Sequence, residues 1–373
     1  MLPTIDSEVS DPAAARALIV ALTERVRALQ QSADALRVDN ALLKRAGSGG
    51  ISQDYVQRLK TDLRDLRTFA RKRGLDLETI ALLSGSGEGV HIPAPAAMDQ
   101  TLALSMPPDR AVRELRPLTM TPMRRLGSAL ALTSAFRLVQ LNGLSLAMSD
   151  GMDWRDARGG GALGLARGES VEAACAVDEF DPPHSVAIVT RRGWCRVMPW
   201  SVVESLYTSG LPISPYDAND APAWIAPWNG GDLLLVTRLG RWVRLPAGVL
   251  EPAGQEAIVL EQDDDVACGC VIADDTQTIH FVGADGAQFA VAAAGLQAHK
   301  KTGVKTQLLR RDWVALLCGI ATRTDAVVML TMGGELIVSA LRGVRAAERP
   351  SEARPLNVAG QRLAAACILG QVR

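Results

Sequence analysis

A hairpin pattern that returns every 46 to 50 residues most strongly constrains the fold of this chain. In the clearest copy, residues 233–236 form an apolar strand, residues 237–240 a tight turn, and residues 242–245 a second strand. A glycine at the last turn position supplies the positive φ that such a turn requires. The five turn glycines are Gly143, Gly193, Gly240, Gly286 and Gly334. Because one hairpin cannot bury both of its faces alone, the repeat predicts hairpins that pack around a ring or along a stack.

The rest of residues 111–373 also follows a β pattern. Short apolar runs alternate with turns rich in Gly, Pro and Asp. Each repeat has room for about four strands, which is the content of one propeller blade. Residues 101–135, together with the C-terminal strand, can supply a sixth blade beside the five visible hairpins. We therefore predict a mainly β fold: a five- or six-bladed β-propeller over residues 111–373, preceded by an N-terminal α-helical coiled coil.

Residues 1–46 carry the heptad pattern of a leucine zipper. β-Branched residues at the a positions and leucine at the d positions favour a parallel dimer, and a buried Asn at an a position fixes its register. The predicted dimerisation residues are Ile19, Leu22, Val26, Leu29, Leu36, Asn40 and Leu43. This helix either pairs with a second copy of the chain or packs against the second helix of its own chain.

The segment between the zipper and the propeller has two predicted parts. Residues 51–83 form a basic helical segment, with a short last helix over residues 75–83, and its charge suits either nucleic acid or a solvated helix face. Residues 84–110 contain several glycines and prolines without periodicity, so we expect a linker there.

The last two repeats carry a resemblance to a known family. An apolar strand over residues 326–331, a turn at Gly334 and a restarted strand over residues 335–339 follow the order of its blades. Lys300-Lys301-Thr302-Gly303 is similar to its basic, glycine-rich box. These repeats resemble the C-terminal DNA-wrapping β-propeller, or β-pinwheel, of the gyrase A subunit and of the related topoisomerase IV subunit. The resemblance implies that double-stranded DNA is bound without sequence specificity at the edge of the propeller.

This chain departs from the family pattern in its box and in its charge. The family box has adjacent arginines and a Gly-Gly pair, where this chain has two lysines and a threonine. Residues 121–373 contain 24 basic and 26 acidic residues, whereas DNA wrapping neutralises phosphates with clustered Lys and Arg.

Local clusters of basic residues are the candidate DNA contacts. Other arginines line two successive hairpins: Arg191, Arg192 and Arg196 in one, and Arg238, Arg241 and Arg244 in the next. These clusters form either one basic stripe around the edge or the ordinary solvated face of the hairpins. The predicted DNA-binding residues are Lys300, Lys301, Lys305, Arg310, Arg311, Arg342, Arg345 and Arg349.

No catalytic, cofactor or metal-binding motif stands out. The chain lacks a phosphate-binding Gly-Lys-Ser/Thr loop and a Gly-x-Ser-x-Gly elbow. Cys268 and Cys270 are the only closely spaced cysteines, and no histidine lies at ligand spacing from them. In the gyrase family a cleavage domain with a tyrosine nucleophile precedes the propeller, and no tyrosine of this chain has such a context. We predict that the protein is not an enzyme and that it needs no cofactor or metal.

The leading functional hypothesis is an accessory DNA-binding protein. A zipper dimer with two propellers would bend, wrap or bridge DNA in the nucleoid, with a topoisomerase or another nucleoid protein as partner. With no signal peptide or membrane-spanning stretch expected, we predict a cytoplasmic location. The alternative is a dimeric protein-interaction scaffold whose propeller has lost DNA wrapping.

Overall fold

A computed structural model describes most of the β-rich region and one helix before it. The described residues are 53–72, 76, 78–94, 102–103, 118–148, 163–178, 182–213, 219–309, 313–322, 325–357 and 362–370, with Ala21, Glu24 and Ala28. The structure divides into two compact units, Met1–Leu77 and Glu78–Arg373. The predicted dimerisation residues, Ile19, Leu22, Val26, Leu29, Leu36, Asn40 and Leu43, lie outside the described residues.

The first unit contains helix α2 (Gln53–Lys72), which has 20 residues. Leu66 and Ala70, four residues apart on one face, are buried, while Arg64 and Lys72 are exposed. Arg71 Nε lies 3.2 Å from a carboxylate oxygen of the buried Asp76. None of the helices in the described ranges is long and apolar enough to cross a membrane.

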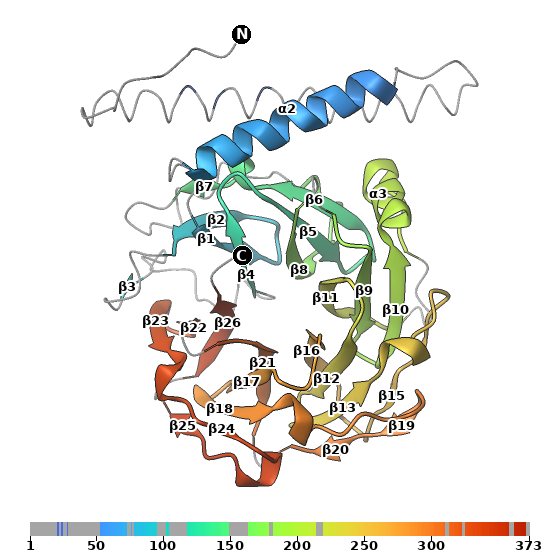
Figure 1. Cartoon of the computed structure of the whole chain (residues 1–373), viewed down its shortest axis with the longest axis vertical. Helices are drawn as coiled ribbons and strands as arrows, with labels where there is room; N and C mark the ends of the chain where they lie inside the picture. Colours follow the sequence, from blue (N-terminus) through green and yellow to red (C-terminus); the bar gives the residue numbers. More distant parts are fainter. Residues whose placement is uncertain are drawn as a thin grey trace. The chain divides into compact units, whose positions relative to one another are not determined.

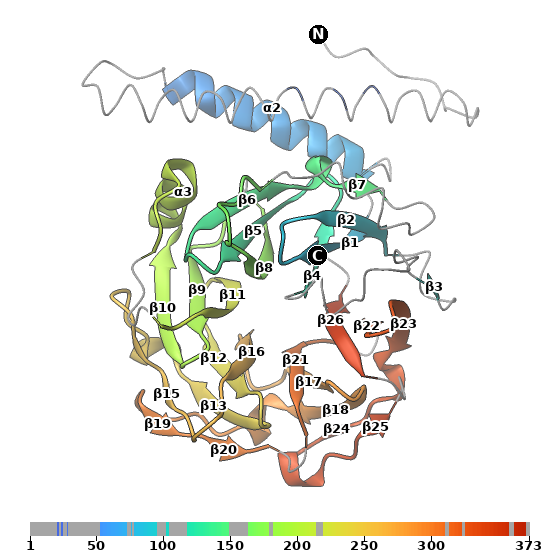
Figure 2. The same ribbon diagram turned by 180° about the vertical axis from the view of Figure 1, so that it is seen from behind.

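In the described residues of the second unit, six sheets of three to five strands follow one another around a ring (Figures 1 and 2), and two loop strands form a further two-stranded sheet. A hairpin forms the middle of each of the six sheets. These hairpins are β1 (Glu78–Ser84) with β2 (Gly89–Pro93), β5 (Ser128–Thr133) with β6 (Leu138–Asn142), β9 (Ser185–Thr190) with β10 (Trp194–Pro199), β12 (Asp232–Thr237) with β13 (Arg241–Leu245), β17 (Thr278–Gly283) with β18 (Ala287–Ala292), and β22 (Ala326–Thr331) with β23 (Glu335–Ala340). We number the repeats 1 to 6 in this order, and each sheet takes the number of its hairpin.

One further strand pairs antiparallel with each hairpin on the inner side of its sheet. The inner strands are β4 (Leu118–Arg124), β8 (Val171–Val177), β11 (Pro222–Trp228), β16 (Val266–Ile272), β21 (Ala315–Ile320) and β26 (Leu363–Leu369). Each inner strand lies against the inner strand of the next repeat, and β26 lies against β4. The six sheets therefore complete a ring although they remain separate sheets.

The segment between each hairpin and its inner strand, here called the edge loop, crosses to the preceding sheet. Outer strands from these loops pair as follows: β14 (Gln255–Glu256) with β10, β20 (Gln307–Leu308) with β13, β24 (Ala346–Ala347) and β25 (Leu356–Asn357) with β18, β7 (Ala147–Met148) with β2, and β3 (Leu102–Ala103) with β23. The edge loop of repeat 3 carries α3 (Trp200–Ser209) instead. Since β3 belongs to repeat 1 and β23 to repeat 6, the same exchange also links the two ends of the ring.

The core is divided into six apolar clusters, one between each pair of neighbouring sheets. Between sheets 6 and 1, for example, Ile80 and Leu82 pack against Val328 and Leu330, and all four are at most 1% exposed. Full burial of one such side chain contributes about 1.5–3 kcal/mol. The first and last repeats are thus joined by the same packing as consecutive repeats.

Four of the five predicted turn glycines lie in hairpin turns. Gly193, Gly240, Gly286 and Gly334 have φ values of 85°, 73°, 81° and 86°, and each N–H donates to the carbonyl three residues earlier. The prediction for Gly143 was wrong, because this residue lies in the 3-10 helix η3 (Gly143–Ser145) after the hairpin. In repeat 2 the turn position is taken by Phe136, whose φ is 56°.

The prediction of a helix over residues 75–83 and a linker over residues 84–110 was also wrong for residues 78–94, which form the hairpin of β1 and β2. Residues 79–83 are buried on both faces of strand β1. A strand of this kind lacks the alternation of apolar and polar residues that would distinguish it from a helix in the sequence. Gly87, one of the glycines on which the linker prediction rests, has a φ of 80° and lies in the turn between β1 and β2. The blade beyond the five visible hairpins is therefore sheet 1, which forms around residues 78–124 rather than residues 101–135.

Candidate nucleic-acid interface

Three of the predicted DNA-binding lysines lie on the edge loop of repeat 5, residues 293–314, here called the lysine loop. It contains η6 (Ala293–Gly295), β19 (Val304–Lys305) and β20. Lys300, Lys301 and Lys305 are all exposed, and no hydrogen bond or ion pair joins their side chains to another described residue. Their charges are therefore available to a ligand in solvent.

Three predicted arginines lie on the next edge loop, residues 341–362, here called the arginine loop. It contains η7 (Leu341–Gly343), β24, η8 (Pro350–Glu352) and β25. Arg342, Arg345 and Arg349 are exposed and make no ion pair within the described part of the chain. Arg310 and Arg311, the other two predicted residues, lie outside the described residues.

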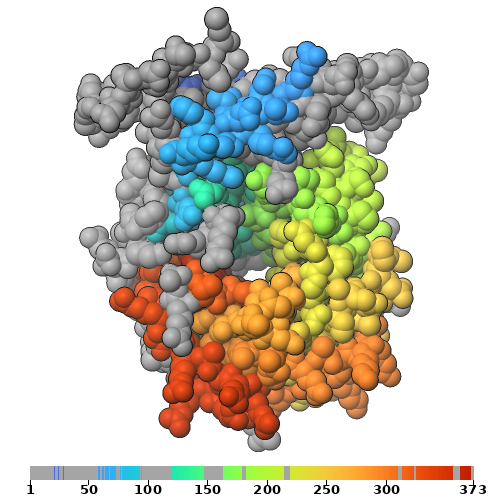
Figure 3. All heavy atoms as spheres, in the orientation of Figure 1, coloured from blue at the N-terminus to red at the C-terminus, as the bar shows by residue number. Residues whose placement is uncertain are grey.

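The lysine loop and the arginine loop meet at the edge of the ring. A β-carbon added to Gly295 would collide with the carbonyl oxygen of Glu348, so the close approach of the two loops requires a glycine here. The loops border one surface hollow with a volume of about 800 Å³. It is lined by Trp242, Gln297, Gln307, Leu308, Glu348 and Arg349, among others. Repeats 5 and 6, which carry the two loops, are shown in orange and red in Figure 3.

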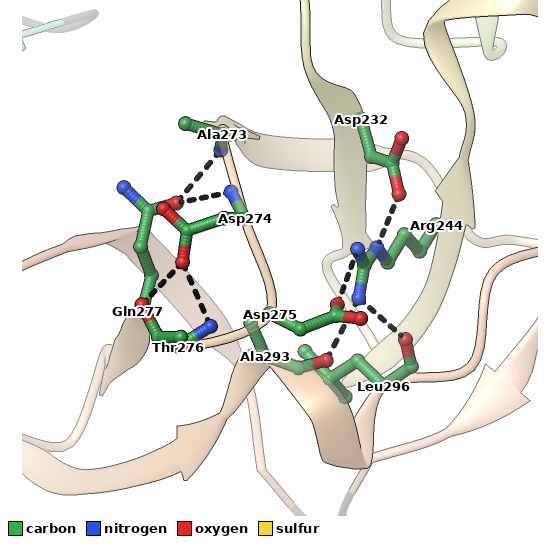
Figure 4. Close-up of polar contacts among 9 residues, drawn as sticks. All are labelled: Asp232, Arg244, Ala273, Asp274, Asp275, Thr276, Gln277, Ala293 and Leu296. Carbon is green, nitrogen blue, oxygen red and sulfur yellow. Dashed lines mark hydrogen bonds and ion pairs between the residues drawn. The ribbon is translucent and has the colours of Figure 1, made fainter.

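Arg244 on β13 anchors the base of the lysine loop (Figure 4). Its guanidinium donates to the carbonyl oxygens of Ala293 at 2.8 Å and Leu296 at 3.2 Å. The same group lies 2.7 Å from a carboxylate oxygen of Asp232 and 2.7 Å from one of Asp275. Arg244 is only 7% exposed. It is therefore a structural residue of the interface and is not available to bind DNA.

The segment that presents Asp275 is itself held by local hydrogen bonds. The Asp274 carboxylate accepts hydrogen bonds from the hydroxyl and, at 2.8 Å, the backbone N–H of Thr276, and these bonds lower the pKa of Asp274. Gln277 accepts from the N–H of Ala273 at 2.7 Å. These acids therefore shape a turn, as Asp commonly does.

The hairpin arginines do not extend the basic surface. Arg191 pairs with Glu172 at 2.8 Å, Arg238 with Asp265 at 2.7 Å, and Arg241 with Glu261 at 2.7 Å. Arg196 donates to the carbonyl oxygen of Pro252 at 3.1 Å. Nearby carboxylates neutralise three of these arginines. The structure therefore does not support the alternative in which one continuous basic stripe runs through both hairpins.

The remaining reactive groups of the described residues lie in the core. All six cysteines are buried thiols, and burial raises the pKa of Cys175, Cys195 and Cys367 to about 12. No cluster of three or more His, Cys, Asp or Glu side chains in the described ranges is arranged to hold a metal ion. The exposed edge loops are therefore the principal candidate surface in this part of the chain.

Sequence reasoning located the lysines and arginines but missed how they are segregated. The lysine loop has five basic residues and one acidic residue, and the arginine loop has five and two. The near-neutral charge of residues 121–373 hides this local excess. Counting charge per edge loop would have revealed it, but the loops are defined only by the strand exchange seen in the structure.

Comparison with known proteins gives structural neighbours but no sequence relatives. No protein-family model matches the chain, and no curated protein matches it. The C-terminal domain of DNA gyrase A is similar, with a TM-score of 0.62 and 9% identity, over 78% of this chain and 99% of that chain. The C-terminal domain of DNA topoisomerase IV is similar with a TM-score of 0.51 and 15% identity, over 79% of this chain and 94% of that one. The chain therefore has a gyrase A C-terminal-like fold, as the resemblance of its last two repeats predicts.

Proposed function

We propose that this protein binds double-stranded DNA at the edge of its ring, through the lysine loop and the arginine loop. One observation carries the proposal. Two adjacent edge loops of a gyrase A C-terminal-like fold present exposed basic side chains that no described carboxylate neutralises. The proposed DNA contacts among the described residues are Lys300, Lys301, Lys305, Arg342, Arg345 and Arg349.

The chemistry of these side chains favours phosphate contacts over base readout. Lys and Arg on short loops can neutralise phosphates, whereas sequence is commonly read by a helix or a β-ribbon placed in the major groove. Six neutralised phosphates predict that the logarithm of the affinity falls with the logarithm of salt concentration with a slope of about −5. Binding is therefore expected to be steeply salt-dependent and nearly independent of sequence.

We further propose how the whole chain uses this surface. Each sheet serves as one blade of a six-bladed propeller, and the N-terminal zipper joins two copies into a homodimer. Two rings on one DNA molecule gain from effective concentration even where each binds weakly. The expected outcome is bending or bridging of DNA in the cytoplasm by a protein without catalytic activity, with a topoisomerase or nucleoid protein as a partner.

The test is DNA binding by the full-length protein, followed by fluorescence anisotropy across a salt series. The triple variant Lys300→Gln/Lys301→Gln/Lys305→Gln should lose at least tenfold in affinity and flatten the salt slope by about 2–3. The matched control is Arg191→Gln/Arg238→Gln/Arg241→Gln, which removes three charges that already have carboxylate partners. Equal losses in the two variants would contradict the proposed surface.

A protein-interaction scaffold is the second candidate, and helix α3 favours it. Val202 and Leu211, on and just after this helix, are 41% and 54% exposed, and no other edge loop contains an α-helix within the described residues. Absence of DNA binding at low salt in both the full-length protein and its variants would favour this function over DNA binding.

A further inference from the structure

The six edge loops differ sharply in charge. The loop of repeat 4, residues 246–265, has six acidic residues and no basic one, and is here called the acidic loop. Residues 200–221 in repeat 3 have three acidic residues and no basic one, while residues 94–117 in repeat 1 have three of each. Residues 143–170 in repeat 2 have four acidic and three basic residues. Only the lysine loop and the arginine loop have a net positive charge.

The acidic loop lies directly beside the lysine loop. Its strand β15 (Ile258–Val259) pairs in parallel with β19 of the lysine loop, so that Val259 is the partner of Lys305. The N–H of Gly303 also donates to the carbonyl oxygen of Ala257 at 3.1 Å. The change from acidic to basic surface therefore occurs across a single pair of strands.

The acidic loop keeps exposed carboxylates after its local ion pairs are counted. Glu261 and Asp265 pair with Arg241 and Arg238. Glu251 and Glu256, in contrast, are exposed and make no ion pair with any residue that the structure describes. Glu256 lies on β14, the outermost strand of sheet 3, directly opposite Trp194. A DNA backbone that continued along the edge would meet these carboxylates.

We infer that DNA contacts only an arc of the ring, at the outer edges of sheets 4 and 5, and that the acidic loop ends this path at sheet 3. The inference rests on the proposed function. Phosphates within the Debye length of about 10 Å are attracted by the lysine loop and repelled by Glu251 and Glu256. The DNA then leaves the ring at the border between β19 and β15 and does not wrap around it.

The size of the arc sets the expected length of bound DNA. Neighbouring sheets pack about 10 Å apart, so the edges of two sheets cover roughly 20–30 Å. One turn of B-DNA spans about 34 Å and 10 base pairs. Each ring should therefore protect about one helical turn of DNA.

The experiment is a nuclease-protection assay: the full-length protein is bound to duplexes of increasing length at low salt, and the lengths of the DNA fragments that survive digestion are measured. Each protected stretch should stay near one turn as the duplex grows, and Lys300→Gln/Lys301→Gln/Lys305→Gln should remove it. Glu256→Lys should lengthen the protected stretch and steepen the salt slope by about 1, because it adds one phosphate contact. Glu204→Lys on α3, with the same change of charge, should leave both quantities unchanged.

The outcomes separate the inference from the proposed function. Protection that lengthens with the duplex until it exceeds several turns per ring would overturn the arc while DNA binding stands. An equal response to Glu256→Lys and Glu204→Lys would overturn the role of the acidic loop. No protection or binding at any duplex length would overturn the proposed function and the inference together.

Discussion

At the scale of single residues, Arg244 and His91 occupy the same place in two different repeats. Each lies four residues after the turn glycine of its hairpin and binds a carbonyl oxygen of a 3-10 helix in the next repeat. Arg244 reaches Ala293, and His91 Nε2 donates to Gly143 at 2.7 Å because a carbonyl oxygen can only accept. One hairpin position therefore fixes the start of the neighbouring edge loop in both places.

Replacement of Arg244 should show how much this anchor contributes. Arg244→Met removes the cationic partner of Asp232 and two hydrogen bonds to backbone carbonyls, and the loss of a hydrogen bond that involves a charged group costs about 1.5–3 kcal/mol. Arg238→Met, at an arginine whose side chain is 45% exposed, should cost less than about 1 kcal/mol. Urea unfolding of both variants measures the difference, and equal losses would contradict the anchoring role.

The titration of His91 gives a prediction for acid stability. Burial, aided by the charge of Arg125, lowers the pKa of His91 from 6.5 to about 4. The unfolded chain therefore takes up a proton near pH 6.5 that the folded chain does not, and the free energy of unfolding should fall as the pH drops from 6.5 towards 4.

The stability lost through His91 between pH 7 and pH 5 should be about 2 kcal/mol. His91→Gln keeps a donor for Gly143 and cannot titrate, so its unfolding midpoint should vary less over this range. His280, whose pKa burial also lowers to about 4, contributes separately and is present in both proteins. An unchanged pH dependence of the midpoint would show that the His91 pKa is not lowered.

At the scale of elements, the contact between the lysine loop and the arginine loop can be tested through a glycine. Gly295→Ala should force Glu348 and its loop to move, at a cost of about 1–3 kcal/mol for overpacking. Gly343→Ala is the matched control, since it ends the corresponding 3-10 helix of the next repeat and has nothing within 4 Å of an added β-carbon. Its effect should stay within about 0.5 kcal/mol. Thermal unfolding distinguishes the two, and equal midpoints would show that the loops do not pack closely.

The elements that can be predicted from the sequence are hairpins whose turns carry glycine and whose two strands stand out as short apolar runs. Repeats 3 to 6 meet both conditions, so their hairpins were placed correctly from the sequence. Repeat 2 was shifted because Phe136, not glycine, takes the positive φ in its turn. Repeat 1 was missed because β1 is buried on both faces. Exchange of outer strands depends on contacts between distant segments, so the meeting of the two basic loops could not be predicted.

At the scale of the whole second unit, repeat 1 should be as stable as the repeats in the middle of the sequence. Strand β1 pairs with β2 and β4 on its two sides, and residues 80–83 are fully buried. Their amide protons should exchange with deuterium as slowly as those of residues 233–236 in β12, which are equally buried. Hydrogen exchange with mass spectrometry measures both segments. Exchange of residues 80–83 at the rate of an open chain would contradict the buried central strand that the structure shows in repeat 1.

Because the outer strands are exchanged between repeats, the charged edge loop of a repeat lies on the sheet of the preceding repeat. The lysines of repeat 5 lie on the edge of sheet 4, and the acids of repeat 4 lie on the edge of sheet 3. Moving or deleting one repeat would leave one sheet without its outer strand and would carry that charge to another sheet. The repeats of this ring are therefore not interchangeable modules, and their order along the chain is inherited together with the pattern of charge around its rim.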